Sequence, residues 1–303
     1  MENRQRLLNP TLMALAAALG GLLFLVAHRF ESPTRDLVLG MATSFVFFVV
    51  FDLLLAIDVI VREGRLRAFF GTELTRDQLL LTCADFELHD DARAVLEQSQ
   101  LRIHYQRPHL EGAPLHTEPI LFDRSMCLSD IQGLMSVAAM LGGRQKKVPM
   151  LVQDGEVWAT HGDCSFVASG LTDNHCTELY RLADQPSLFA IGSNDGLPTV
   201  RLLDGLHVEN DRTTEYAIIV RYHPDRHGRP NRRWFLIAGL EEFGSAAAGD
   251  FLAREWRTLS KLARKGDDFV AVVALPRGRV ASAQLRHVVA RDASRAWRVA
   301  LPQ

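Results

Sequence analysis

The sequence has little cysteine, and none of it lies in a spaced pair. The four cysteines, Cys83, Cys127, Cys164 and Cys176, are scattered, and no CxxC occurs. A disulfide-stabilised secreted domain or a zinc module of paired cysteines needs closer and more regular spacing. The four thiols therefore indicate reduced cysteines in a cytoplasmic domain.

Common catalytic and nucleotide-binding motifs are missing as well. The eleven histidines show no HExxH or HxH spacing, and there is no GxSxG, GxGxxG or P-loop pattern. His175 and Cys176 are adjacent, but adjacency alone does not make a base and a nucleophile. The sequence thus predicts neither a metal site nor a cofactor, and it favours a function other than catalysis.

The charge is small overall but unevenly placed. The net charge is −2, so no global field attracts nucleic acid. Residues 70–220 hold 11 Lys and Arg against 22 Asp and Glu, whereas residues 221–303 hold 16 against 8. This asymmetry favours salt bridges between the acidic and basic parts of the protein, and an anionic partner is the second interpretation.

Apolar residues are concentrated in the first sixty positions. Residues 10–28 and 37–61 form two apolar runs, and roughly 20 such residues span a membrane as a helix. A cleaved signal peptide is the alternative for the first run. That run is longer than usual for a signal, has no small-residue cleavage site, and is followed at once by a second run. We expect residues 1–67 to form a two-helix transmembrane hairpin.

The arginines around the two runs predict the orientation of the hairpin. Only residues 29–36 separate the runs, so the helices must be antiparallel. The flanks carry five arginines and the short loop carries two. Because positive residues stay on the cytoplasmic side, both termini are expected in the cytoplasm.

One carboxylate lies within the second apolar run. Asp52 is past its midpoint, where an exposed carboxylate costs about 2.5–3.5 kcal/mol on insertion scales. It is either protonated or paired with a hydroxyl such as Thr43 or Ser44 of a neighbour, or it lies at an oligomer contact or lines a pore. Asp58 is roughly 240° further around the helix and close enough to the interface to reach water. The second interpretation of Asp52 implies a homo-oligomer.

The rest of the chain is predicted to be a helical connector followed by a mixed domain. Residues 62–100 look helical, with Thr75 as an N-cap, so that residues 68–100 form the connector and residues 101–303 form an α/β domain. Strands are expected at residues 101–105, 148–152, 165–168, 188–191, 216–222, 234–238 and 269–274, and helices at residues 130–141 (capped by Ser129), 177–182 and 245–262. This alternation predicts a Rossmann-like, mostly parallel sheet covered by helices.

Two turns from strand to helix are candidates for a ligand site. Both place a glycine at the carboxyl end of a strand, where open α/β sheets bind ligands and free N–H groups attract anions. The residues concerned are Gly170, Thr172, Asp173 and Asn174 in the first turn, and Gly239, Gly244 and Ser245 in the second. The alternative is that the glycines serve only the tight turns.

An arginine-rich loop at residues 221–234 reads RYHPDRHGRPNRRW. Its tip carries Arg226, Arg229, Arg232 and Arg233 between two expected strands. The loop is either solvated or resting on an acidic membrane surface. In the sharper interpretation its guanidinium groups bind nucleotide phosphates, which planar arginine suits well.

Three segments together, GDCSFVASGLTDNHCTELYRL, EYAIIVRYHPD and RRWFLIAGLEEFGSAAAGDFL, resemble a domain of uncharacterised prokaryotic proteins. In that domain a strand ends in a glycine turn with an Asn, a Tyr-led strand reaches Asn-Pro, and a third strand ends in Gly before Gly-Thr-x-Ala-Ala. Here His223-Pro224 replaces Asn-Pro, and the helix starts with residues 244–247, Gly-Ser-Ala-Ala. The resemblance covers roughly residues 100–275 and implies no activity.

The layout of two spans and a Rossmann-like domain is also similar to membrane effectors of bacterial nucleotide-signalling defence systems. That resemblance implies an antiviral effector in the bacterial inner membrane. Its cytoplasmic domain would sense a small anionic ligand such as a nucleotide or oligonucleotide, and its oligomeric hairpins would form or gate an ion channel. A membrane-tethered enzyme acting on a nucleotide or nucleotide sugar is the alternative, and a structural scaffold is the third.

Overall fold

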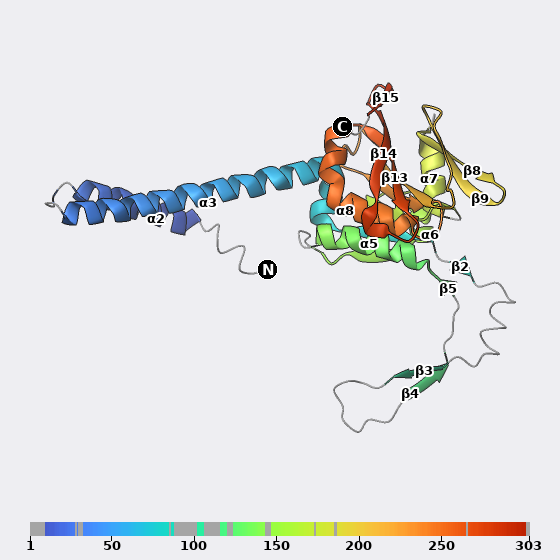
Figure 1. Cartoon of the computed structure of the whole chain (residues 1–303), viewed down its shortest axis with the longest axis horizontal. Helices are drawn as coiled ribbons and strands as arrows, with labels where there is room; N and C mark the ends of the chain where they lie inside the picture. The colour runs from blue at the N-terminus through green and yellow to red at the C-terminus, as the bar shows by residue number, and fades with distance from the viewer. Residues whose placement is uncertain are drawn as a thin grey trace. The chain divides into compact units, whose positions relative to one another are not determined.

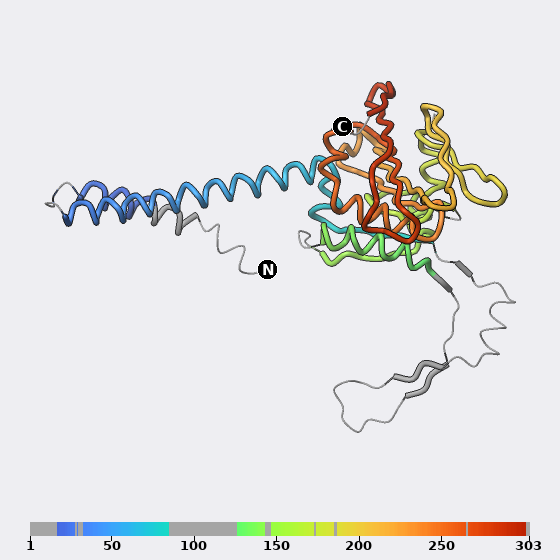
Figure 2. Tube along the Cα trace, viewed as in Figure 1, coloured from blue at the N-terminus to red at the C-terminus, as the bar shows by residue number. Residues whose placement is uncertain are grey.

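The computed structural model describes most of the chain, in two compact units. The described residues are 10–27, 29, 33–84, 86–87, 102–105, 116–119, 124–142, 147–172, 174–184, 187–264 and 266–300, and the others are grey in Figure 2. The first unit is Met1–Ala68 and the second is Phe69–Gln303.

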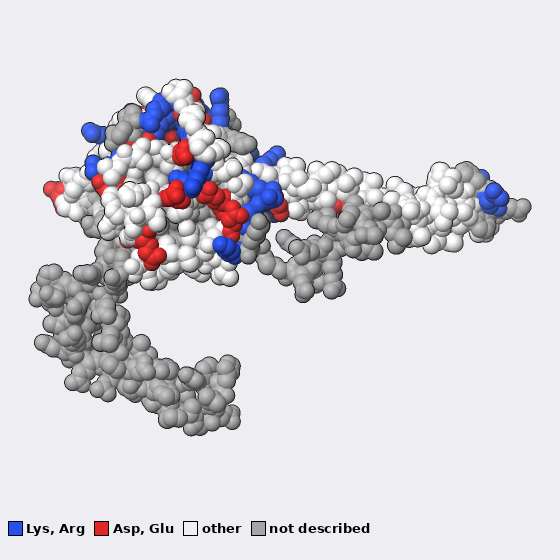
Figure 3. Space-filling view, turned by 180° about the vertical axis from the view of Figure 1, so that it is seen from behind, with Lys and Arg blue, Asp and Glu red and all other residues white. Residues whose placement is uncertain are grey.

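The first unit contains two helices, α2 (Pro10–Ala27) and α3 (Thr34–Phe70). They pack at Gly20, where a Cβ atom would lie 3.2 Å from that of Phe45. Among the described residues only α3 is long and apolar enough to cross a membrane, which indicates membrane association. Its long middle part shows almost no charge in Figure 3. Two crossings and the cytoplasmic position of both termini stay predictions.

α3 continues past the predicted second span and then stops. Its 37 residues correspond to roughly 55 Å, against about 30 Å for the hydrocarbon core. Helix was correctly expected for residues 62–70, but the helical connector is wrong in the described residues beyond them. There a short π-helical turn (Glu73–Asp77) leads to the strand β1 (Leu80–Cys83). The three leucines at 79–81 fit a buried strand and a helix equally well by periodicity.

The second unit is a mixed α/β structure built on an eight-stranded sheet. The strand order is β15-β14-β13-β11-β12-β7-β1-β6. The strands are β1, β6 (Met150–Gln153), β7 (Phe166–Ser169), β11 (Thr214–Tyr222), β12 (Trp234–Gly239), β13 (Asp268–Pro276), β14 (Gln284–Arg291) and β15 (Trp297–Val299). The strands β6, β1, β7 and β12 pair in parallel, and only β11 and β14 run against the others. The sheet is therefore mostly parallel, as predicted.

Helices and a small sheet cover the two faces (Figure 1). One face carries α5 (Leu128–Leu141) and α8 (Gly244–Leu262). The other carries α6 (Asp154–Ala159), α7 (His175–Ala183) and the three-stranded sheet of β8 (Phe189–Asn194), β9 (Leu197–Leu202) and β10 (His207–Val208). Smaller elements are the pairs β2 (Phe86–Glu87) with β5 (Arg124–Ser125) and β3 (Arg102–Tyr105) with β4 (His116–Pro119), and a 3-10 turn at Val280–Ser282.

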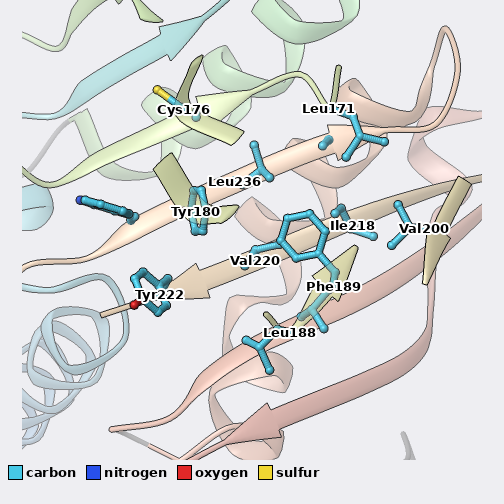
Figure 4. Packing of buried hydrophobic residues seen from close by; sticks show 14 of the residues in the cluster. Leu171, Cys176, Tyr180, Leu188, Phe189, Val200, Ile218, Val220, Tyr222 and Leu236 are labelled. Atoms are coloured by element: carbon cyan, nitrogen blue, oxygen red, sulfur yellow. The ribbon is translucent and has the colours of Figure 1, made fainter. Parts of the chain in front are cut away.

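The core on the α7 face is rich in aromatic rings. Tyr180 of α7 packs against Tyr222 and Trp234 of the sheet at centroid distances of 6.0 and 5.7 Å, and these two rings are 5.7 Å from each other. Figure 4 shows Tyr180 and Tyr222 together with Leu236 and Val220 of the same cluster. Strands buried on both faces appear in sequence as continuous apolar runs, which is why β11, β12 and β13 were predicted correctly.

Candidate functional site

The carboxyl ends of four parallel strands meet at one edge of the sheet, here called the carboxyl edge. Along the chain β6 follows β1 on one side of it and β7 follows on the other. The carboxyl end of β1 is therefore a topological switch point, where open α/β sheets place their ligands. The two glycine turns follow β7 and β12 at this same edge.

A buried carboxylate joins the two turns. The Ser169 hydroxyl donates to Asp130 Oδ1 at 2.9 Å, and the Ser245 hydroxyl also bonds to Asp130. The Gly239 N–H donates to Ser245 Oγ at 3.0 Å, and the Asn174 amide donates to the Ser169 carbonyl at 2.6 Å. Burial raises the pKa of Asp130, although the hydrogen bonds from Ser245 and Ser169 act in the opposite direction.

The glycines at this edge have a steric role. Gly170 has φ 104°, and a Cβ atom there would lie 3.2 Å from Asp130 Oδ2 and 3.3 Å from Asn174 Nδ2. A Cβ atom on Gly239 would lie 2.5 Å from the Ser245 nitrogen and 2.6 Å from Gly244 Cα. These close approaches support the interpretation that glycine is required by the turns themselves.

The first N–H groups of α7 already have acceptors within the protein. The Cys176 N–H donates to the side chain of Asn174 at 2.8 Å, as an N-cap does. The His175 N–H donates to Asp154 Oδ2 at 2.7 Å. Thr172 is exposed on the turn, and Asp173 lies outside the described residues. This helix start therefore offers an anion fewer donors than the sequence suggested.

The start of α8 is similarly occupied. The Ala246 N–H donates to Ser129 Oγ at 3.0 Å, and the Phe243 N–H donates to Glu215 Oε2 at 3.1 Å. Ser129 was expected to cap its own helix, but α5 begins at Leu128, two residues before the expected start, with Cys127 at the N-cap position. The Ser129 hydroxyl oxygen instead accepts a hydrogen bond from the first turn of α8. Carboxylates thus surround the carboxyl edge, which suits the hydroxyl or amine groups of a ligand better than its phosphate.

A histidine and a buried carboxylate form a pair at this edge. His175 Nδ1 lies 3.2 Å from Asp154 Oδ2, and their side chains are 58% and 3% exposed. The Trp158 ring is 5.8 Å from that of His175. A carboxylate on one ring nitrogen orients the imidazole and leaves the other for a ligand or a proton. The sequence pointed to His175, but Asp154 was missed because it lies 21 residues away.

The four loop arginines lie at the opposite end of the sheet, here called the amino edge. Their loop ends at Trp234, where β12 begins, whereas Gly239 ends that strand. Six residues of strand place these ends roughly 17 Å apart. The glycine turns and the arginines, all of them candidate ligand-binding residues, therefore lie at opposite ends of the strands and cannot contact the same small group.

All four of these arginines also have partners inside the protein. Arg226 Nη2 lies 2.7 Å from Asp268 Oδ2, and Arg229 Nη1 lies 3.1 Å from Asp163 Oδ1. Arg232 also pairs with Asp163. Arg233 is buried and donates to main-chain carbonyl oxygens of its own loop. These contacts are the internal pairing that the uneven charge of the sequence indicated first.

A buried charged cluster at the amino edge was not predicted. Arg221 is fully buried, and Arg291 pairs with both Asp184 and Asp268. His223 Nδ1 lies 2.7 Å from Asp268 Oδ1. The signal was present as an arginine inside the apolar run of β11 and as two adjacent aspartates at the start of β13.

Burial and pairing shift the pKa values of this cluster. Burial lowers the pKa of His223 to about 4 and that of Arg221 to about 9. Burial alone would raise the pKa of Asp268, but hydrogen bonding to His223 and the positive charge of Arg226 outweigh it, and the pKa is lowered. The cluster therefore holds an ionised Asp268 beside a neutral His223 at neutral pH.

No family model matches the chain, and comparison with characterised proteins and solved structures finds nothing similar. Function must therefore be argued from the geometry. In the described part of the chain, no group of three or more His, Cys, Asp or Glu side chains is placed to hold a metal ion.

The two aspartates of the predicted pore lie in α3. Asp52 is partly exposed and Asp58 is exposed in the single chain. The hydroxyls of Thr43 and Ser44 donate to carbonyl oxygens of α3 itself, at 2.8 and 2.9 Å. Each hydroxyl therefore already uses its one hydrogen-bond donor within α3, which makes it a weaker partner for an aspartate of a neighbouring copy.

Proposed function

We propose that the chain is a membrane-anchored receptor or effector with a Rossmann-like cytoplasmic domain. The domain senses a small anionic ligand of the nucleotide class, and the oligomeric hairpins form or gate a membrane pore. In this proposal α2 and α3 both cross the bacterial inner membrane, with both termini in the cytoplasm.

The observation that carries the proposal is the continuity of α3. The same helix is apolar enough to cross a membrane and ends in Phe69 and Phe70, which are 1% and 0% exposed in the second unit. A tether that served only for attachment would not need to be buried in a folded domain. A helix built into the core can carry a change in the domain to the membrane.

The carboxyl edge is the proposed ligand site. Asp154 orients the exposed His175 ring, which can donate a hydrogen bond to an anionic group when it is protonated. The carboxylates nearby suit the hydroxyl groups of a nucleoside. Mass spectrometry of small molecules that copurify with the detergent-solubilised chain tests this site. A bound nucleotide lost in His175→Ala supports it, and a nucleotide retained in that variant contradicts it.

The pore is tested at Asp52. If copies of α3 surround a shared axis, inward carboxylates favour cations along it. Asp52→Asn should keep membrane insertion and oligomer size but change cation leakage from vesicles, and Asp52→Leu should insert more readily. Crosslinking in native membranes that captures only monomers would end the pore proposal, and so would oligomers whose Asp52 faces lipid.

The orientation has its own test. A reporter fused to the C-terminus should be active only in its cytoplasmic form, because the flanking arginines outnumber those of the short loop. Periplasmic activity of the reporter would reverse the proposed orientation.

A membrane-tethered enzyme acting on a nucleotide or nucleotide sugar is a second candidate, favoured by the same His175–Asp154 pair. A histidine oriented by a buried carboxylate is a common general base. The two functions differ in what happens to the copurified molecule. Chemical change of that molecule on incubation with the native chain, abolished in Asp154→Asn, would favour the enzyme.

A further inference from the structure

The last residues of α3 end in an aromatic cluster of the second unit. The Phe69 ring lies 5.7 Å from Phe235 and 5.9 Å from Phe269, and 6.1 Å from Trp256 of α8. The Phe70 ring lies 4.9 Å from Phe235 and 6.3 Å from Trp256. The helix end thus contacts two strands and α8 at once.

A fully buried arginine stacks on only one of these two phenylalanines. The Arg221 guanidinium carbon lies 4.8 Å from the Phe69 ring centre and 4.9 Å from that of Phe269. Its Nε and Nη2 atoms donate to the Asp267 carbonyl oxygen at 3.1 and 2.7 Å, and Nη2 donates to that of Arg264 at 2.9 Å. Both carbonyls belong to the loop that follows α8. Arg221 therefore joins the end of α3, the sheet and this loop.

The chain beyond α3 is held closely as well. Gly71 ends the helix with φ 82°, and a Cβ atom there would lie 3.0 Å from Arg233 Cγ and closer still to the Asn231 carbonyl oxygen. The Thr75 hydroxyl donates to the Gly71 carbonyl oxygen at 2.7 Å, and Leu74 is fully buried. These contacts are not those of a flexible linker.

We propose that Phe69 and Arg221 form a latch that fixes the end of α3 to the amino edge of the sheet and to the α8 loop. A displacement of β11 or of that loop is then transmitted to α3 instead of being absorbed between them. The regulatory meaning of the latch rests on the proposed membrane function of α3, whereas its existence does not.

Hydrogen exchange of the full chain in detergent tests the latch. Phe69→Leu keeps an apolar side chain but removes the ring face under Arg221, and Phe70→Leu is the matched control at a neighbour not stacked on it. A buried cation–π contact of this kind corresponds to roughly a three- to thirty-fold change in a local equilibrium. We expect exchange to rise by that factor in peptides covering residues 62–76 and 263–268 in Phe69→Leu and in Arg221→Met. Peptides of β7 and α7 should stay unchanged.

The double variant separates a latch from general destabilisation. In Phe69→Leu with Arg221→Met the increase should be smaller than the product of the two single increases, because both remove the same contact. A multiplicative increase, an increase spread evenly over the second unit, or an equal increase in Phe70→Leu would each refute the latch. Vesicle leakage is measured separately, so a chain without pore activity would end the proposed function while the exchange result still decides the latch.

Discussion

Replacing Gly249 by alanine should force α5 away from α8 and destabilise the second unit. A Cβ atom on Gly249 would lie 2.5 Å or less from the Cα, carbonyl carbon and carbonyl oxygen of Gly133. Ordinary contacts of this kind lie at about 3.4–4 Å, so the helices must separate by roughly 1 Å, and backbone atoms cannot rotate away. The same separation would pull Ser245 from Asp130 at the candidate site.

The size of the effect follows from two opposing terms. Overpacking of this kind costs about 1–3 kcal/mol, and replacing a mid-helix glycine by alanine returns about 0.5–1 kcal/mol. The net loss of about 1–2 kcal/mol should lower the Tm by roughly 2–8 °C for a unit of this size. Gly155→Ala is the matched control, because nothing lies within 4 Å of a Cβ atom at that helical position.

Thermal unfolding of the full chain in detergent measures this difference. The fluorescence of Trp234 and Trp256, which are 3% and 5% exposed, reports on the second unit. Gly155→Ala should leave the Tm unchanged or slightly raised. An equal Tm for Gly249→Ala and Gly155→Ala would show that the α5–α8 contact is not as close as described.

Three further predictions concern buried groups. The folded pKa of His223 is lowered to about 4, below about 6.5 for the unfolded chain, so the unfolded state binds more protons and stability is lost as pH falls from 6.5 to 4; the Tm should fall less over this range in His223→Gln, and equal slopes would contradict the burial argument. Gly170→Ala should cost about 1–3 kcal/mol at its positive φ, and an unchanged urea midpoint would argue against the strained turn. Asp184→Asn removes a buried partner of Arg291 and should cost about 3–5 kcal/mol, whereas Asp250→Asn, in a partly exposed pair, should cost less than about 1 kcal/mol by urea unfolding.

Elements with strong local patterns could be predicted from the sequence. Continuous apolar runs identified β11, β12 and β13, and the amphipathic pattern identified α8. The strand β1 was missed because its leucines carry no period that separates strand from helix. The strand β14 was missed because its first half is partly exposed and polar, so that only its pairing with β13 defines it.

The sequence predicted those parts of the candidate site that lie at the end of a recognisable strand. Among parallel strands, a glycine that follows a strand lies at the carboxyl edge whatever the strand's place in the order, and β7 and β12 are parallel, so the two glycine turns lie at the same edge. The partners of the site residues depend on strand order instead. Asp130 and Asp154 reach the turns after β7 from helices that precede it in the chain, and no spacing in the sequence indicates such contacts.

The position of β1 between two later strands has a consequence for synthesis of the protein. This strand lies between β6 and β7, yet it leaves the ribosome only about ten residues after α3, the helix proposed to cross the membrane. Its first partner, β6, begins at Met150, about 70 residues later, which takes roughly 3–14 s at ordinary translation rates. If α3 crosses the membrane as proposed, an apolar strand with two unpaired edges stays close to the insertion machinery during that interval. Nascent chains stalled between residues 90 and 145 should therefore be the ones that bind chaperones most strongly.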